Sequence, residues 1–156
     1  MVRLAGCDDP LLGRPLALYD VFRSPTGDPL GIDLVYLVIG RMTRRFALLQ
    51  PCQNVELWGP LGNGFSPGDE RQLIMVAGGI GQTPFPAVAQ EALGRRSYGD
   101  PPRQVQPVEQ LTLCYGVRSA EYLAGVEDFR RRGVDVHIAT DDGSAGHHGL
   151  VTDLLR

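Results

Sequence analysis

The first 66 residues alternate short apolar segments with turn-forming residues. Three segments have the length and apolar character of β-strands: residues 16–23, 32–39 and 54–58. The first two are separated by a cluster of Ser, Pro, Gly and Asp that is typical of a turn. Residues 43–49 fit a short helix with Thr43 as its N-cap. This pattern predicts antiparallel β-structure.

From Arg71 onward, apolar segments of strand length alternate with helical periodicity. The expected strands are residues 73–77, 111–115 and 134–139, and the expected helices are residues 84–94, 120–132 and a third that begins at residue 149. Gly133 stands where it would cap the end of the second helix. Strands that alternate with helices predict a parallel sheet with helical crossovers, and the change of pattern places a domain boundary near residues 66–70.

Composition narrows the classes of function. All 15 basic residues are Arg, because the chain contains no Lys, which excludes a lysine Schiff base and a P-loop lysine. A net charge of -3 argues against a nucleic-acid partner. No apolar stretch approaches the roughly 20 residues of a membrane span. The 3 cysteines have neither metal-ligand spacing nor an even number, so we expect no metal site and a reducing cytoplasm.

The strongest local motif is the segment VAGGIGQTP, which follows an expected strand and precedes an expected helix. Gly78, Gly79 and Gly81 permit positive φ and a close approach of the backbone to a ligand. Thr83 is suited to cap the helix, and Pro84 suits its first turn. The helix N-terminus would then face a pyrophosphate. The alternative is that the glycines only make a tight connection between strand and helix.

Four blocks, in this order, resemble the ferredoxin-reductase-like flavoproteins, in which a FAD-binding β-barrel precedes an NAD(P)-binding α/β domain. The blocks are residues 14–19, 58–65, 77–84 and 140–146. Two stretches most resemble one branch, the electron-transfer subunit of NAD-dependent dihydroorotate dehydrogenase: residues 59–65 and 142–153. The resemblance implies a partial antiparallel β-barrel of the FAD-binding type over residues 1–68. An α/β doubly wound parallel-sheet NAD(P)-binding domain would follow over residues 69–156.

The resemblance also implies which residues contact the cofactors. The expected FAD contacts are Arg14, Pro15, Leu16, Ala17, Val35, Tyr36, Leu37, Met42 and Thr43. The expected NAD(P) contacts are Gly78, Gly79, Gly81, Thr83, Pro84, Arg118, Asp142, Gly143 and Ser144. Three positions depart from the family pattern, since Ala17 replaces a Ser or Thr, Leu37 stands where relatives often have Arg, and Met42 replaces a glycine.

Several of these residues also have an ordinary structural explanation. Arg14 suits a FAD pyrophosphate through its fork of charged donors, and the alternative is a surface salt bridge. Tyr36 would lie against a flavin or simply pack within a strand. Arg118 follows a strand at the ligand-binding edge of the sheet, and the alternative is an exposed charge at a helix start. Residues 141–144 would otherwise form a common Asp-Gly turn.

The implied reaction is hydride transfer between NAD(H) and FAD, with no catalytic side chain. The implied partner is the dihydroorotate dehydrogenase catalytic subunit, reached through a 2Fe-2S centre whose cysteine-rich segment this chain lacks. The chain therefore resembles a copy truncated at both ends. Two alternatives stay open: an NAD(P)H:flavin or ferredoxin-type reductase, and a catalytically silent nucleotide-binding remnant. The choice between NAD and NADP also stays open.

Overall fold

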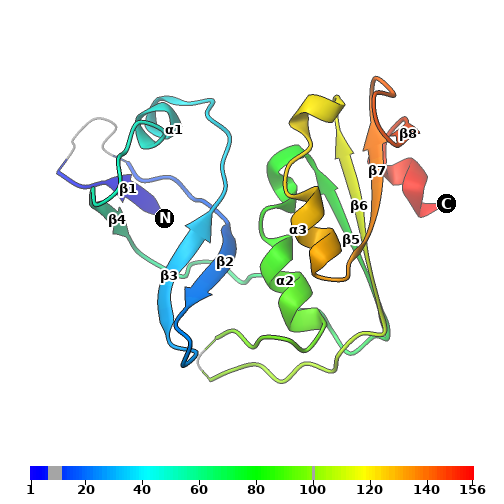
Figure 1. Cartoon of the computed structure of the whole chain (residues 1–156), viewed down its shortest axis with the longest axis horizontal. Coiled ribbons are helices and arrows are strands. Elements are labelled where there is room, and N and C mark those ends of the chain that lie inside the picture. The colour runs from blue at the N-terminus through cyan, green and yellow to red at the C-terminus, as the bar shows by residue number, and fades with distance from the viewer. Residues whose placement is uncertain (7–11, 100) are drawn as a thin grey trace.

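The computed structural model describes residues 1–6, 12–99 and 101–156. It has an antiparallel part at the N-terminal end of the chain and a parallel sheet at the C-terminal end, as the pattern predicted (Figure 1). Two helices, α2 (Phe85–Ala92) and α3 (Val126–Arg131), lie between these parts. The C-terminal 3-10 helix η3 (Val151–Leu155) lies on the other side of the parallel sheet.

The antiparallel part consists of short strands in two separate pairs. Its elements are β1 (Val2–Leu4), β2 (Leu18–Arg23), β3 (Pro29–Leu34), α1 (Arg41–Phe46) and β4 (Val55–Leu57). Strand β1 pairs with β4, and β2 pairs with β3, both in antiparallel register. Each pair is a two-stranded sheet within the described residues. These pairs confirm the antiparallel character that the sequence predicts.

Two details of this part differ from the prediction. The strand expected at residues 32–39 runs from Pro29 to Leu34 instead, because the apolar residues after Leu34 leave the sheet and lead into α1. The N-cap of α1 is Gly40, whereas Thr43 lies in the first turn of the helix. The Thr43 hydroxyl accepts a hydrogen bond from the Gly40 N–H at 3.0 Å, so Thr43 closes the helix start from inside.

The parallel sheet has four strands in the order β5-β6-β7-β8. They are β5 (Gln72–Gly78), β6 (Gln110–Val117), β7 (Asp135–Thr140) and β8 (His147–His148). In the register, Gly78 pairs with Gly116, and Val117 pairs with Thr140. The carboxyl ends of the three longer strands therefore meet at one edge of the sheet, where open α/β sheets bind ligands.

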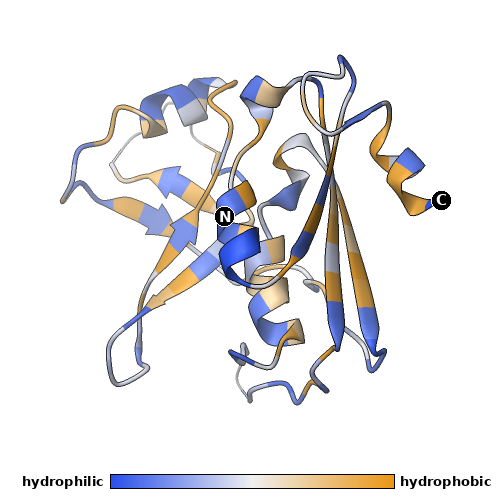
Figure 2. Cartoon of the chain, turned by 45° about the vertical axis from the view of Figure 1, so that its right-hand side comes forward, coloured by the Kyte–Doolittle hydropathy of each residue, from blue (hydrophilic) through white to orange (hydrophobic). Residues whose placement is uncertain are grey.

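The main hydrophobic core lies between this sheet and helices α2 and α3. Leu113 of β6, Ala89 of α2 and Phe129 of α3 are fully buried in it. Figure 2 shows the apolar residues along the strands of the parallel sheet. On the opposite face, Val151 of η3 packs against Gly116 of β6, so η3 approaches the sheet at the one position in β6 that has no side chain.

The second crossover is broken where the sequence predicts one helix over residues 120–132. The segment begins as a 3-10 turn, η2 (Ala120–Tyr122), and α3 starts only after Gly125. Gly125 has φ +71°, which favours glycine, and it interrupts the helix. Gly133, with φ +73°, follows the end of α3 as predicted.

The glycine-rich segment also begins its helix later than predicted. Residues after β5 form a 3-10 turn, η1 (Gly79–Gln82), before α2 begins. Thr83 ends that turn, and Pro84 occupies the N-cap position of α2 without a side-chain hydrogen bond. Thr83 is therefore not the N-cap of α2, because α2 begins one residue later than predicted and Thr83 instead ends the 3-10 turn.

Candidate functional site

A cavity of about 750 Å³ opens at the carboxyl edge of the parallel sheet. Its floor comes from the ends of β5 and β6, and one wall comes from residues of the antiparallel part. It is lined by Leu37, Ile39, Gly78, Gly79, Ile80, Tyr115, Gly116, Val117, Arg118, Tyr122, Ala124, Asp141, Leu150, Val151 and Thr152. The volume lies within the range of small-molecule sites.

The glycines of the loop leave room for a ligand. No heavy atom outside the neighbouring residues lies within 4 Å of the position that a Cβ would take on Gly78, Gly79 or Gly81. Gly79 has φ +53°, so it needs a glycine for its backbone conformation as well. The backbone is therefore open at these three positions, of which Gly78 and Gly79 line the cavity, and such openness is what a phosphate-binding loop requires.

Gln82, in the same loop, holds the loop against the protein interior. Its side chain is fully buried, and its Nε2 donates a hydrogen bond to the Ala124 carbonyl at 3.4 Å. The loop is thereby joined to the chain segment just before α3. Its Oε1 is buried without a partner among the described residues.

The cavity holds one cationic and one anionic side chain. Arg118 is exposed, and its guanidinium forms no hydrogen bond or ion pair within the part of the chain that the structure describes, although its backbone carbonyl accepts a hydrogen bond from the Asp142 N–H at 3.2 Å. Asp141 is exposed on the same lining. A guanidinium without a partner is available to a phosphate group, to which it can donate two parallel hydrogen bonds.

The turn after β7 fastens the loop that carries Arg118. The Ser144 hydroxyl accepts a hydrogen bond from the Ala120 N–H at 2.8 Å. Oδ1 of Asp142 accepts hydrogen bonds from the Ser144 hydroxyl at 2.5 Å and from its N–H at 2.9 Å. These bonds lower the pKa of Asp142 below its usual value. Asp142, Gly143 and Ser144 lie beside the cavity and are not part of its lining.

The structure brings only some of the expected cofactor residues together. Leu37, Gly78, Gly79 and Arg118 all line the cavity. Three more residues expected at the nicotinamide cofactor follow the glycines outside the lining, namely Gly81, Thr83 and Pro84, and Asp142, Gly143 and Ser144 are outside it as well.

The other residues expected at FAD lie apart from this cavity. Arg14 is exposed and its backbone bridges to Val2. The ring of Tyr36 packs edge-on against Phe46 at a centroid distance of 5.9 Å. Met42, a residue of α1, is buried at 2% exposure. The remaining members of this set are also outside the lining: Pro15, Leu16, Ala17, Val35 and Thr43.

Several lining residues were not expected from the sequence. Ile39 and Val151 are apolar residues whose place in the cavity depends on contacts between distant segments. Tyr115 was assigned to a strand, and the only sequence signal for its place in the cavity was its position near the end of that strand. The open glycine loop, the unpaired Arg118 and the apolar Leu37 and Ile39 together fit a ligand that has phosphates and flat rings.

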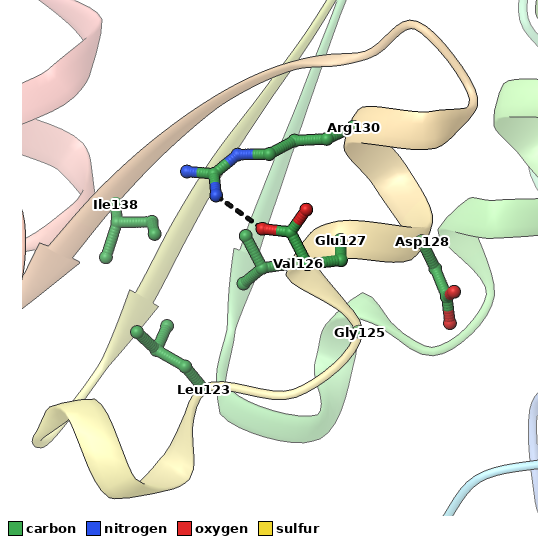
Figure 3. A pocket seen from close by; sticks show the side chains of 7 residues that line it. All are labelled: Leu123, Gly125, Val126, Glu127, Asp128, Arg130 and Ile138. Atoms are coloured by element: carbon green, nitrogen blue, oxygen red, sulfur yellow. Dashed lines mark hydrogen bonds and ion pairs between the residues drawn. The ribbon is translucent and has the colours of Figure 1, made fainter.

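A second hollow of about 510 Å³ lies at α3 (Figure 3). Leu123, Val126 and Ile138 form its apolar side, and Arg130 bonds Glu127 at 2.7 Å beside it. None of the expected cofactor residues lines it. Among the described residues, no group of three His, Cys, Asp or Glu side chains could hold a metal ion, and no helix is long and apolar enough to cross a membrane.

The sequence of the chain is similar to those of known proteins. No protein-family model matches the chain. It is 32% identical over 157 residues to the dihydroorotate dehydrogenase B (NAD(+)) electron transfer subunit of Desulforamulus reducens, covering 99% of the chain and 53% of that protein. It is 35% identical over 159 residues to the same subunit of Geobacillus kaustophilus, covering 99% of the chain and 55% of that protein. The chain is homologous to these electron transfer subunits. It spans about half the length of the curated relatives it matches.

Solved structures agree with this homology at the level of the fold. One of them is an NADH-dependent reduced ferredoxin-NADP oxidoreductase, described for flavin-based electron bifurcation. The match covers 92% of the present chain and 52% of the oxidoreductase chain, with a TM-score of 0.62 and 22% sequence identity. Another is the cytochrome b5 reductase domain of Ulva prolifera nitrate reductase. The match covers 80% of the present chain and 46% of that domain's chain, with a TM-score of 0.51 and 18% sequence identity. The chain thus has a ferredoxin reductase-like fold, with antiparallel sheets before a parallel sheet.

Proposed function

We propose that the cavity binds NAD(H) and that the chain acts in an electron-transfer flavoprotein subunit, passing electrons between NAD(H) and FAD. The observation that carries this proposal is the meeting of the glycine loop and Arg118 at one cavity on the carboxyl edge of the sheet. Homology to electron transfer subunits supports it. When bound, NADH would supply a hydride that an oxidised flavin would accept.

The residues of the chain bind and orient the dinucleotide. The backbone at Gly78 and Gly79 is open to the pyrophosphate, and Arg118 adds a positive charge. Leu37 and Ile39 offer an apolar wall to a flat ring and exclude water from that side. Asp142, Gly143 and Ser144 hold the Arg118 loop by the bond from Ala120 to Ser144.

The flavin contacts belong to the same proposal. Arg14 is exposed, and its charge suits a pyrophosphate, while Leu37 reaches the cavity from the antiparallel part. In this interpretation the chain has two domains, residues 1–68 on the flavin side and residues 69–156 on the nicotinamide side. The partner would be a dihydroorotate dehydrogenase catalytic subunit in the cytoplasm, and a 2Fe-2S centre of the family type would need thiolates from outside this chain.

A binding titration tests the nicotinamide site. Purified chain is titrated with NADH and NADPH by calorimetry, beside the variants Gly78→Ala and Gly31→Ala. Gly78 has ordinary extended dihedrals (φ -106°, ψ 125°), and a Cβ there meets no protein atom, so its methyl group would enter the cavity without straining the fold. Gly31 is equally open but lies on β3, outside the cavity. We expect roughly tenfold weaker binding for Gly78→Ala, with an unchanged melting temperature. If both variants and the original chain bind the dinucleotides with equal affinity, the proposal that this cavity is the nicotinamide site is overturned.

A flavin titration separates the proposal from its strongest competitor. Of the residues expected at FAD, Leu37 alone lines the cavity, which favours a nucleotide-binding remnant as the second candidate function. A chain that binds added FAD and is bleached by NADH supports the electron-transfer function. A colourless chain that binds NADH but takes up no FAD supports the remnant.

A further inference from the structure

Asp20 of strand β2 is a buried carboxylate that collects donors from the other part of the chain. It is 8% exposed. Its Oδ1 accepts hydrogen bonds from Arg96 Nη1 at 2.8 Å and from the Tyr98 hydroxyl at 3.3 Å. Its Oδ2 accepts one from Arg132 Nη2 at 3.0 Å. Arg96 and Tyr98 follow α2, and Arg132 follows α3, so the ends of both crossover helices converge on one carboxylate.

The neighbouring residue makes a second connection to α3. The Tyr19 hydroxyl donates a hydrogen bond to Oδ2 of Asp128 at 2.8 Å. Figure 3 shows the Asp128 side chain on the opposite side of α3 from Arg130. Burial and the bond to Asp128 raise the pKa of Tyr19, so its phenol stays protonated and keeps donating at neutral pH. Strand β2 also packs against α2.

The same contact reaches the glycine loop through Gly125. A Cβ on Gly125 would lie 2.9 Å from the Tyr19 hydroxyl and 3.7 Å from Nε2 of Gln82. Gln82, in turn, belongs to the loop and bonds the Ala124 carbonyl. Strand β2, the start of α3 and the proposed phosphate loop therefore meet at one glycine.

An apolar contact would join these segments at a lower cost in desolvation. Arg132 is only 18% exposed, and its Nε is buried with no partner within the described residues, as is Oε1 of Gln82. Burying charged and polar groups is expensive, and pairs of this kind often add little net stability. The hydrogen bonds of this network are directional, and all of them are satisfied in only one arrangement of the segments. The network therefore fixes the geometry of these segments.

We propose that Tyr19 and Asp20 are positioning residues that fix the orientation of the antiparallel part on the parallel-sheet part, and so the width of the cavity between them. This inference rests on the proposed function for its consequence: efficient transfer needs the reacting atoms about 3–3.5 Å apart, and a misplacement of about 1 Å can slow the step roughly a hundredfold. The residues touch neither proposed cofactor, and they act through the position of β2.

The decisive experiment needs no cofactor. Residual dipolar couplings of backbone amides in β2–β3 and in β5–β7 report the relative orientation of the two parts. We compare Asp20→Asn with Asp33→Asn, an exposed carboxylate on β3 whose Cα pairs with that of Asp20. In the original chain and in Asp33→Asn, one alignment tensor should fit both sets of couplings. In Asp20→Asn, the two sets should require different tensors.

A second variant keeps the test valid if Asp20→Asn does not fold. Arg96→Gln removes one of the two guanidinium donors and leaves the carboxylate paired with Arg132. We expect it to give separate tensors as well. A folded Asp20→Asn or Arg96→Gln that keeps one tensor in the original orientation overturns the proposal.

Stopped-flow reduction of FAD-loaded chain by NADH measures the consequence. Asp20→Asn should reduce the rate of flavin bleaching by roughly tenfold to a hundredfold, with little change in the dissociation constant of NADH. A variant that merely unfolds would lose binding and rate together. If the original chain binds no NADH, the proposed function fails, but the orientation measurement still decides the role of Asp20, and the same measurement on Tyr19→Phe decides that of Tyr19.

Discussion

The Tyr19 hydroxyl donates to Asp128 Oδ2 at 2.8 Å, and this bond is the largest cause of the lowered pKa of Asp128. The bond joins residues that lie 109 positions apart in the sequence. An ionised Asp128 is therefore part of how β2 is attached to α3, which makes the attachment sensitive to acid.

Tyr19→Phe should raise the pKa of Asp128 toward its ordinary value of 3.8. Because the folded-state pKa is lowered, the contribution of Asp128 to stability is present above pH 3.8 and is lost as the pH falls through the folded value. The destabilisation caused by Tyr19→Phe should therefore shrink in acid. Carboxyl NMR titration measures the pKa, and urea unfolding at neutral and acid pH measures the stability. Arg131→Gln removes a hydrogen bond and a favourable charge from the same carboxyl, so it should also raise the pKa of Asp128. An unchanged pKa of Asp128 in Tyr19→Phe would contradict this assignment.

Gly116→Ala should destabilise the chain and displace η3. The added Cβ would lie 2.7 Å from Cβ of Val151, which is backbone-proximal and cannot rotate away. Crowding of this kind costs about 1–3 kcal/mol. Because Val151 lines the cavity, NADH affinity should fall as well. Gly78→Ala is the matched control for stability, since Gly78 is the register partner of Gly116 and its Cβ meets nothing. Equal unfolding free energies in the two variants would show that η3 is not packed on Gly116.

Arg118→Gln should weaken NADH binding roughly tenfold without changing the melting temperature, because a charge-assisted bond to phosphate is lost while no bond within the described protein is broken. Asp141→Asn removes the negative charge from the same lining and should strengthen binding. Titration at two salt concentrations measures both effects, and the salt dependence should be smaller in Arg118→Gln. An Arg118→Gln variant with unchanged affinity would remove Arg118 from the site.

Arg103→Gln should cost about 1–3 kcal/mol of unfolding free energy. Arg103 bonds Glu91 through Nη2 at 2.6 Å, and the Glu91 side chain is only 3% exposed, so the variant leaves a buried carboxylate without its cation. Arg71→Gln is the comparison, because the Arg71–Glu109 pair is exposed on both sides and should contribute less than about 1 kcal/mol. Urea denaturation of both variants gives the two values; a loss at Arg71 as large as at Arg103 would be the contrary result.

The fold was largely predictable because its strands are short apolar runs bounded by turn residues. The residues from Val35 to Ile39 show the limit of this signal. They are as apolar as a strand, but pairing depends on a partner that the local sequence does not reveal, and they lead to the cavity instead. Gly125 shows another limit, since a helical pattern continues through it while Tyr19, far away in the sequence, occupies the space that a side chain would need.

The candidate site was predictable where it depends on strand ends. Gly78 is the last residue of β5 and Gly79 follows it, while Arg118 directly follows the neighbouring strand β6. The carboxyl ends of neighbouring parallel strands share one edge of a sheet. Ile39 and Val151 reach the same cavity by packing between segments far apart in the chain. Neither periodicity nor a motif marks residues of this kind, so they could be found only from the fold.

The convergence of donors on Asp20 also bears on how the chain folds. The bonds from Arg96, Tyr98 and Arg132 span 76, 78 and 112 positions. Contacts of such long range close large loops, and folding slows as they become more important. Strand β2 can complete its attachment only after the ends of α2 and α3 exist. We therefore expect the parallel sheet and its helices to form first on refolding, with the arrival of β2 as a late and slower phase.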